Sequence, residues 1–173
     1  VIIAVGVHHR QLGLPNENAL VGNGVSYCAV CDGAFFKDKV VGVVGGGNSA
    51  LQEAVLLSDL CEKVYVFQNL AFLTGEKKLV DILSNKSNVE FILEATVKEL
   101  KGEEELSGVV LSTKDGEKEV SLDGLFVAIG LEPKNSAFAE IAGLDANGYF
   151  DAGESCVTKT EGVFVAGDCR QKS

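Results

Sequence analysis

The stretch VVGVVGGGNSALQEAVLLSDL, residues 40–60, decides the fold. Val40–Val44 is a short, continuous apolar run, which predicts a strand buried on both faces. The glycine turn that follows, GGGNSA at residues 45–50, leads into Leu51–Leu60, where small and apolar residues recur at helical spacing. A strand, a glycine turn and a helix in this order are typical of a dinucleotide-binding unit.

Within the glycine turn, Gly45, Gly47 and Ala50 have the spacing G-x-G-x-x-A. The first glycine allows a tight turn, the second lets a pyrophosphate approach the backbone, and the alanine lets the helix pack closely on the strand. The start of the helix, at Asn48 and Ser49, then directs free N–H groups at the phosphates. The alternative is a turn that only packs a helix, but its position between a strand and a helix favours nucleotide binding.

The flanking sequence extends this unit. Val64–Phe67 and Val89–Leu93 predict strands and Glu76–Ser84 predicts a helix, giving a βαβαβ unit with a parallel sheet and right-handed crossovers. Residues 96–122 alternate in polarity between charged turns, which predicts an antiparallel β-meander. Further buried strands are expected at Val1–Gly6 and Leu125–Ile129, and a last strand at Val163–Ala166. The fold class is therefore α/β.

Composition excludes several classes of function. The 173 residues carry a formal net charge of −10, so neither nucleic acid nor an anionic membrane surface is an expected partner. No apolar run has the roughly 18 to 20 residues of a membrane span, and the start lacks the basic region of a signal peptide. We therefore expect a cytoplasmic protein. Five cysteines are too few, and odd in number, for a secreted disulfide framework.

The residues that would bind the nucleotide ribose depart from the usual pattern. An acidic residue is expected about 20 positions after the first glycine. Gln68 and Asn69 stand there instead, and both could bond ribose hydroxyls. Lys77 and Lys78 supply the nearest positive charge, although a solvated helix start is the plainer interpretation. The pattern therefore leaves the identity of the cofactor open.

Cys28 and Cys31 form a C-x-x-C pair, in which a disulfide can close and a thiolate can be stabilised. A redox role needs one thiol to attack and one to resolve, and Asp32 could move the protons. Structural zinc is the alternative, but it needs four ligands and no second such pair is present, so no metal is expected. Cys61 has no spacing signal and is interpreted as a core thiol.

Taken together, the motifs resemble the low-molecular-weight thioredoxin reductases, which are class II pyridine-nucleotide-disulfide oxidoreductases. The resemblance spans essentially the whole chain, in the order CAVCDG (28–33), VVGGGNSA (43–50), FVAIG (126–130) and GVFVAGD (162–168). It implies a Rossmann-like, three-layer FAD/NAD(P)-binding fold. Residues 7–130 would be the pyridine-nucleotide-binding domain that carries the C-x-x-C, and residues 1–6 and 131–173 would be parts of an FAD domain.

The resemblance also implies an activity and roles for residues. Electrons would pass from NADPH through FAD to the dithiol and on to thioredoxin. Cys28 would attack the partner disulfide, Cys31 would face the flavin, and Asp32 would serve as acid and base. Gly167 and Asp168 match the motif whose aspartate contacts FAD. Gly6 and Gly130 fall where the two domains hinge in the family.

Two departures from the family limit these expectations. The amino-terminal FAD-binding G-x-G-x-x-G and the dimerising carboxy-terminal segment are missing, so we expect a fragment that binds FAD weakly or not at all and lacks full turnover. The His-Arg-Arg segment that reads the NADPH 2′-phosphate is replaced by QNL at residues 68–70, which removes the basis for preferring NADPH over NADH.

Three functions remain open from the sequence. The first is a thioredoxin-disulfide reductase fragment, whose parent protein is a homodimer using NADPH or NADH. The second is a ferredoxin- or partner-linked disulfide reductase whose nucleotide site is degenerate. The third is a related reductase that serves another small disulfide protein.

Overall fold

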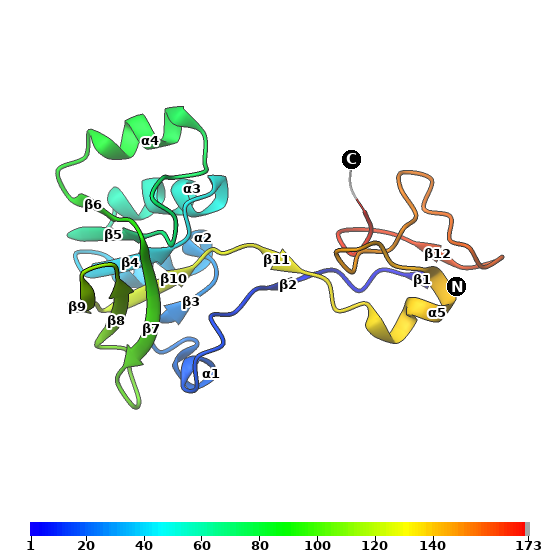
Figure 1. Ribbon diagram of the computed structural model, residues 1–173, viewed down its shortest axis with the longest axis horizontal. Coiled ribbons are helices and arrows are strands. Elements are labelled where there is room, and N and C mark those ends of the chain that lie inside the picture. The colour runs from blue at the N-terminus through cyan, green and yellow to red at the C-terminus, as the bar shows by residue number, and fades with distance from the viewer. Residues whose placement is uncertain (172–173) are drawn as a thin grey trace. The chain divides into compact units, whose positions relative to one another are not determined.

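A five-stranded parallel sheet, in the order β3-β10-β4-β5-β6, organises the larger part of the chain (Figure 1). The computed structural model describes residues 1–171. The sheet strands and the helices beside them are β3 (Val25–Ser26), α2 (Ala29–Asp32), β4 (Val40–Val44), α3 (Asn48–Ser58), β5 (Lys63–Phe67), α4 (Lys77–Ser84), β6 (Val89–Ile92) and β10 (Gly124–Val127). Because every pairing in this sheet is parallel, all its strands end at the same edge.

Helices cover one face of the parallel sheet. Alternate residues of β4 and β5, such as Val41, Val43 and Val66, pack against Ala54 and Leu57 of α3, all fully buried. Every second side chain of each strand points toward α3, and the side chains three or four positions apart on α3 point back toward the strands. Together they form a continuous core. Figure 1 shows α3 and α4 on this side of the sheet.

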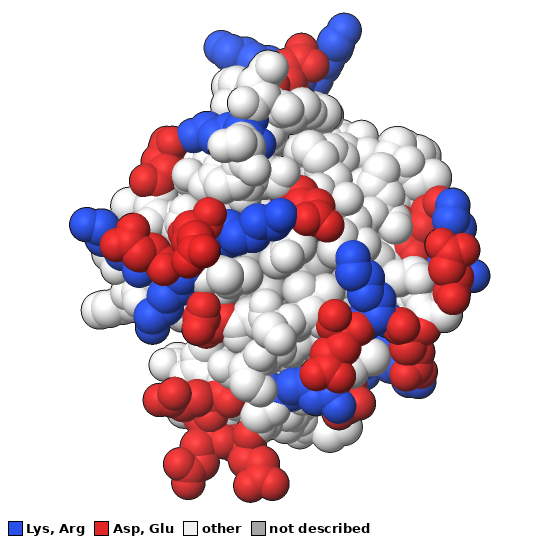
Figure 2. Space-filling view, turned by 90° about the vertical axis from the view of Figure 1, so that its left-hand side faces the viewer, with Lys and Arg blue, Asp and Glu red and all other residues white. Residues whose placement is uncertain are grey.

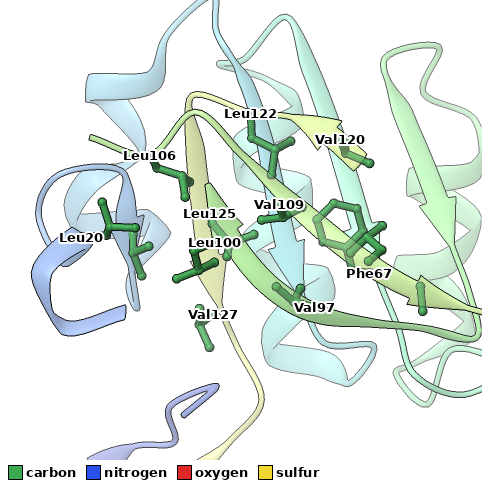
Figure 3. Packing of buried hydrophobic residues seen from close by; sticks show 13 residues of the cluster. Leu20, Phe67, Val97, Leu100, Leu106, Val109, Val120, Leu122, Leu125 and Val127 are labelled. Carbon is green, nitrogen blue, oxygen red and sulfur yellow. The ribbon is translucent and has the colours of Figure 1, made fainter. Parts of the chain in front are cut away.

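A three-stranded antiparallel meander covers the opposite face. It consists of β7 (Ala95–Lys101), β8 (Gly108–Thr113) and β9 (Gly116–Ser121). Figure 3 shows Val97, Leu100 and Val109 from the meander packed against Leu125 and Phe67 of the parallel sheet. The unit therefore has three layers, and the predicted fold class, with its parallel sheet and antiparallel meander, is confirmed.

The chain divides into two compact units. The larger unit is Arg10–Ile129, and the smaller unit joins Val1–His9 to the segment that starts at Gly130. The remaining elements are β1 (Ile2–Ile3), β2 (His8–His9), β11 (Leu131–Glu132), η2 (Ser136–Phe138), α5 (Ala139–Ala142) and β12 (Phe164–Val165) in the smaller unit, and α1 (Glu17–Leu20) and η1 (Gly33–Phe36) in the larger unit. In the smaller unit β1 pairs with β12, β2 pairs with β11, and Ile3, Phe150 and Val165 form a small core.

Two sequence predictions need correction. Residues 1–6 do not form a strand buried on both faces: only Ile2 and Ile3 are extended as β1, and Ile2 is 72% exposed. The reason is that β12 is its single paired neighbour among the described residues, and the core of the smaller unit lies on one side of it. The helix predicted from Leu51 begins earlier, at Asn48, because the last residues of the glycine turn are already helical. The last two residues of the expected FAD-domain segment 131–173 lie outside the described residues.

The surface carries charges of both signs. Figure 2 views the larger unit from the side, and Lys and Arg are interspersed with Asp and Glu over most of this face. An acidic group lies at its lower end, where Figure 1 places the turn between β7 and β8, which contains exposed Glu103, Glu104 and Glu105. Among residues 1–171, no helix has both the length and the apolar character needed to span a membrane.

Candidate functional site

The C-x-x-C pair lies directly after β3, at the edge where the parallel strands end. Cys28 is extended and is the N-cap of α2, and its Sγ accepts a hydrogen bond of 3.2 Å from the Cys31 backbone N–H. The short helix brings the Cα atoms of Cys28 and Cys31 within 5.3 Å, and the two sulfurs are joined as a disulfide. Cys31 is exposed and Cys28 is half-buried. We call residues 26–32 the dithiol turn.

A serine that the sequence analysis missed orients the proposed acid. Ser26 Oγ donates a hydrogen bond of 2.6 Å to Asp32 Oδ2 and accepts one of 3.1 Å from the Cys28 backbone N–H. Ser26 is 5% exposed, so the carboxylate is held by a partner that solvent barely reaches. Asp32 is thereby fixed one residue from Cys31 and hydrogen-bonded to the group that also holds Cys28. No spacing signal marks Ser26, because its role depends on how the chain folds back at Asp32.

The glycine turn lies at the same edge of the sheet, after β4. Gly45 has φ +130, and a Cβ there would lie 2.5 Å from the carbonyl oxygen of Ala128 and 3.0 Å from the Cβ of Ala50. This position therefore requires glycine for the close approach of α3 to the sheet. Gly47 differs, since a Cβ there would meet only Thr74 Oγ1, at 3.8 Å. Packing within the chain does not require glycine at Gly47, which is consistent with an approach by something outside the chain.

The first turn of α3 has backbone donors without a side-chain cap. Gly47 is the N-cap and offers no side-chain acceptor, so the first N–H groups of α3 are available to an anion. Asn48 and Ser49 are exposed there and Ala50 is fully buried. The Asn48 side chain joins α3 to the start of α4: its Oδ1 accepts from the Glu76 backbone N–H at 2.6 Å and its Nδ2 donates to Glu76 Oε1 at 3.1 Å.

The two predicted ribose contacts have different surroundings. Gln68 is 6% exposed and turned inward, with its Oε1 accepting from the Asn69 backbone N–H and its Nε2 donating to the Phe72 carbonyl. Its amide lies so close to Gly46 that a Cβ on that glycine would be 2.4 Å from Nε2. Asn69, by contrast, is exposed. Of the pair, Asn69 is the side chain that a bound ribose could reach without rearrangement.

The predicted FAD and hinge residues belong to or border the smaller unit. Gly167 and Asp168 follow β12 and are exposed, and Gly167 has φ +82 with open space around a hypothetical Cβ. Gly130 is the first residue after the larger unit ends, with φ +102 and similarly open space. Gly6, the other predicted hinge residue, also has positive φ. The turn after β12 therefore leaves room for a ligand to approach the backbone.

Two further ionisable groups, Tyr27 within the dithiol turn and Glu17 on α1, are hydrogen-bonded to each other. Glu17 is 1% exposed and accepts hydrogen bonds from the backbone N–H groups of Leu12 and Gly13 and from the Tyr27 hydroxyl. Burial, reinforced by Glu17, raises the pKa of Tyr27 to about 12, so its hydroxyl stays protonated and donates to the carboxylate. This buried contact braces the residue directly before Cys28, and no sequence motif marked it.

The remaining cysteine of the larger unit is inert by environment. Cys61 is 6% exposed, and burial, with a smaller effect of Asp38, raises its pKa to about 11. A thiol with so high a pKa forms little nucleophilic thiolate, and the prediction of a core thiol is confirmed. Within residues 1–171, the structure brings together no group of three or more His, Cys, Asp or Glu side chains suited to a metal ion.

Comparison with known proteins gives concordant matches. The family model described as pyridine nucleotide-disulphide oxidoreductase matches residues 1–173. The thioredoxin reductase of Mycoplasma genitalium is 46% identical over 176 residues, covering 100% of this chain and 56% of that protein. The thioredoxin reductase of Listeria monocytogenes is 42% identical, covering 100% of this chain and 55% of that protein. The chain thus spans about half the length of the curated relatives it matches.

A solved structure agrees with this result. Lactococcus lactis thioredoxin reductase in its FR conformation superposes with a TM-score of 0.89 at 33% identity, covering 99% of this chain and 58% of that one. The sequence resemblance to this group of reductases is therefore confirmed, and so is the Rossmann-like α/β architecture.

Proposed function

The chain belongs to the pyridine nucleotide-disulphide oxidoreductase family, and we propose that it is the nucleotide-binding and dithiol part of a thioredoxin-disulfide reductase. One observation carries the proposal. A closed Cys28–Cys31 disulfide and a glycine turn of the dinucleotide-binding type follow two strands of one parallel sheet, separated only by β10, and so lie at one edge. The carboxyl edge of such a sheet is where α/β proteins bind nucleotides.

The dithiol turn supplies the exchange chemistry. In the reduced state, the thiolate of Cys28 attacks one sulfur of the partner disulfide and forms a mixed disulfide, while the other partner sulfur leaves as a thiolate. Cys31 then attacks Cys28, which restores the Cys28–Cys31 bond and releases the partner as a dithiol carrying two electrons. Asp32, held by Ser26, takes and returns the protons that these thiols lose and gain.

The residues of the smaller unit fit a flavin, as the family implies. FAD bound to the whole protein would pass two electrons from NAD(P)H to the Cys28–Cys31 disulfide. Gly167 and Asp168 would hold it, since the turn after β12 is exposed and leaves room at Gly167 for close backbone contact. The expectation that this chain alone binds FAD weakly stays a prediction.

The glycine turn would bind the pyridine nucleotide. Gly45 and Ala50 set the turn against the sheet, Gly47 leaves space for the pyrophosphate, and the N–H groups at the start of α3 donate to it. Asn69 and, after rotation of its amide, Gln68 would contact the ribose. No Lys or Arg occupies residues 68–70, so we expect little charge-based preference for NADPH over NADH.

The remaining proposals concern the whole protein. Its partner would be thioredoxin or a similar small disulfide protein, it would act as a homodimer, and it would work in the cytoplasm. Neither nucleic acid nor a membrane is proposed as a partner, in keeping with the net charge of −10.

Calorimetric titration of this chain with NADH and with NADPH tests the nucleotide part of the proposal. We expect both to bind with similar affinity, and Gly47→Val to abolish binding of both. Binding of neither nucleotide would overturn this part and favour a non-nucleotide donor such as ferredoxin.

A second assay mixes the reduced chain with oxidised thioredoxin and quantifies thiol transfer. Absence of transfer would overturn the dithiol part.

A further inference from the structure

A carboxyl group that the exchange chemistry does not use lies against the dithiol turn. Glu53 is in the middle of α3, on the face that carries buried Ala50 and Leu57 three residues before it and four after it. That face packs on α2 and on the residue that ends it: Ala29 belongs to the same buried cluster, and a Cβ on Gly33, the C-cap of α2, would lie 3.3 Å from a Leu57 methyl group. Glu53 is therefore directed toward the start of α2.

The Glu53 carboxyl is only partly satisfied in this position. The backbone N–H of Ala29 lies close enough to favour its charged form, while its Oε2 is inaccessible to solvent and has no hydrogen-bond partner. Burial raises the pKa of Glu53 to about 6, and the Ala29 N–H opposes this rise. At neutral pH the group is therefore largely an ionised, incompletely solvated carboxylate, on the face of α3 that packs against Ala29.

Other charged groups near α3 do not neutralise Glu53. The elements packed on α3 carry Asp32 on α2, Lys63 on β5, and Lys77, Lys78 and Asp81 on α4, whereas β4 carries no charged residue. Asp32 accepts from Ser26, Lys63 pairs with Glu90, and the three α4 side chains are exposed. None of them contributes to the shift of the Glu53 pKa. The Glu53 carboxylate therefore has no compensating cation among these groups.

We propose that Glu53 is a positioning residue for the Cys28–Cys31 pair: its buried carboxylate lies beside the start of α2 and, by its charge, opposes formation of a thiolate in the dithiol turn. Reduction of the disulfide adds two electrons and two protons, and the reduced state gains stability when one thiol then ionises. A neighbouring negative charge removes part of that gain. The dithiol is therefore a stronger reductant with Glu53 than without it, which suits a donor of electrons. This inference rests on the proposed redox role of the pair.

The test is the equilibrium of the chain with glutathione at pH 7. Two glutathione thiols supply two electrons and two protons to the Cys28–Cys31 bond and become glutathione disulfide. The ratio of the dithiol to the disulfide form of the chain, at known glutathione concentrations, gives the equilibrium constant for this reduction. For Glu53→Gln we expect a constant about three- to tenfold more favourable to the dithiol, equivalent to about 14–30 mV. We also expect faster alkylation of the reduced variant by iodoacetamide at pH 7, since the pKa of the reacting thiol falls.

Two variants separate charge from structure. Glu62→Gln removes an equal charge from an exposed residue beyond the end of α3 and should match the unaltered chain in both assays. Glu53→Asp keeps the charge and should retain most of the original equilibrium constant. If the role of Glu53 were purely structural, keeping the charge in a shorter side chain would not retain it. If Glu53→Gln equilibrates and alkylates like Glu62→Gln, the inference is overturned while the proposed function stands. If no variant, nor the unaltered chain, exchanges with glutathione, the proposed function itself fails.

Discussion

The dithiol turn and the glycine turn occupy equivalent places in one sheet but are built differently. Each begins where a parallel strand ends, β3 at Ser26 and β4 at Val44, and each leads into a helix. The dithiol turn presents side chains, namely two sulfurs and the Ser26–Asp32 hydrogen bond. The glycine turn has no side chains at Gly45–Gly47, which leaves the backbone N–H groups at the start of α3 open. In the proposed function one edge of the sheet would hold both a group that reacts and a surface that binds, and damage to one should spare the other.

The largest expected effect is a complete loss confined to the dithiol turn. Cys31→Ser removes the resolving sulfur, so the variant should form a mixed disulfide with oxidised thioredoxin but release no reduced thioredoxin. Gel analysis without reductant would detect the trapped adduct. Nucleotide affinity, determined by calorimetry, should be unchanged. Release of reduced thioredoxin by Cys31→Ser would contradict the roles given to the pair.

Asp32→Asn should slow thiol transfer to thioredoxin about 10²-fold, because it removes a positioned proton acceptor while keeping the shape of the side chain. Stopped-flow mixing of the reduced variant with oxidised thioredoxin provides the rate. Ser26→Ala serves as a companion, since it leaves Asp32 in place but unsupported, and a smaller slowing is expected. An unchanged rate in Asp32→Asn would show that Asp32 does not transfer protons in the exchange.

Gly45→Ala should damage the fold as well as the nucleotide site. The new Cβ would meet the Ala128 carbonyl oxygen at 2.5 Å in a backbone conformation with φ +130. We expect the free energy of unfolding to fall by about 3 kcal/mol. Urea denaturation would measure this change. The glutathione equilibrium of the disulfide, determined well below the denaturation midpoint, should stay as it is. A stable Gly45→Ala variant would show that the turn can relax away from β10.

Gly47→Ala is the matched change without a packing cost. The nearest atom to its new Cβ is Thr74 Oγ1 at 3.8 Å, so the free energy of unfolding should stay the same within about 0.5 kcal/mol. Nucleotide affinity should nevertheless fall about tenfold, or about 1.4 kcal/mol, because the Cβ enters the space proposed for the pyrophosphate. Equal affinity in Gly47→Ala and the unaltered chain would favour a turn that only packs a helix.

The smallest expected effect is a pH dependence of stability from Glu53. Its pKa rises from 4.5 to about 6 on folding, so the folded state binds this proton more tightly than the unfolded state. The ionised group therefore costs stability above about pH 6, and the cost disappears as pH falls below 4.5. Glu53→Gln should unfold at a higher temperature than the unaltered chain at pH 8 and at a similar temperature at pH 4, in calorimetric scans. The same difference at both pH values would rule out ionisation as its cause.

Much of the fold was predictable because its signals are local. The apolar run of β4, the spacing of Gly45, Gly47 and Ala50, and the alternation of residues 96–122 each depend on neighbours in the sequence. Boundaries shifted by a few residues, as at the start of α3, because a helix begins where hydrogen bonding permits rather than where apolar residues begin. The prediction for residues 1–6 was wrong because an apolar run cannot show how many strands will pair with it.

Sequence alone determined the strand, turn and helix of the glycine turn and the C-x-x-C spacing that lets Cys28 and Cys31 pair, since both depend on residues a few positions apart. Tertiary structure alone decided the contacts between distant segments. It placed β10 between β3 and β4, turned Gln68 inward against Gly46, and buried the Glu53 carboxyl on the face of α3 that packs against Ala29. These contacts depend on strand order and helix packing. Residues separated by twenty or more positions acquire a common environment only when the sheet has formed.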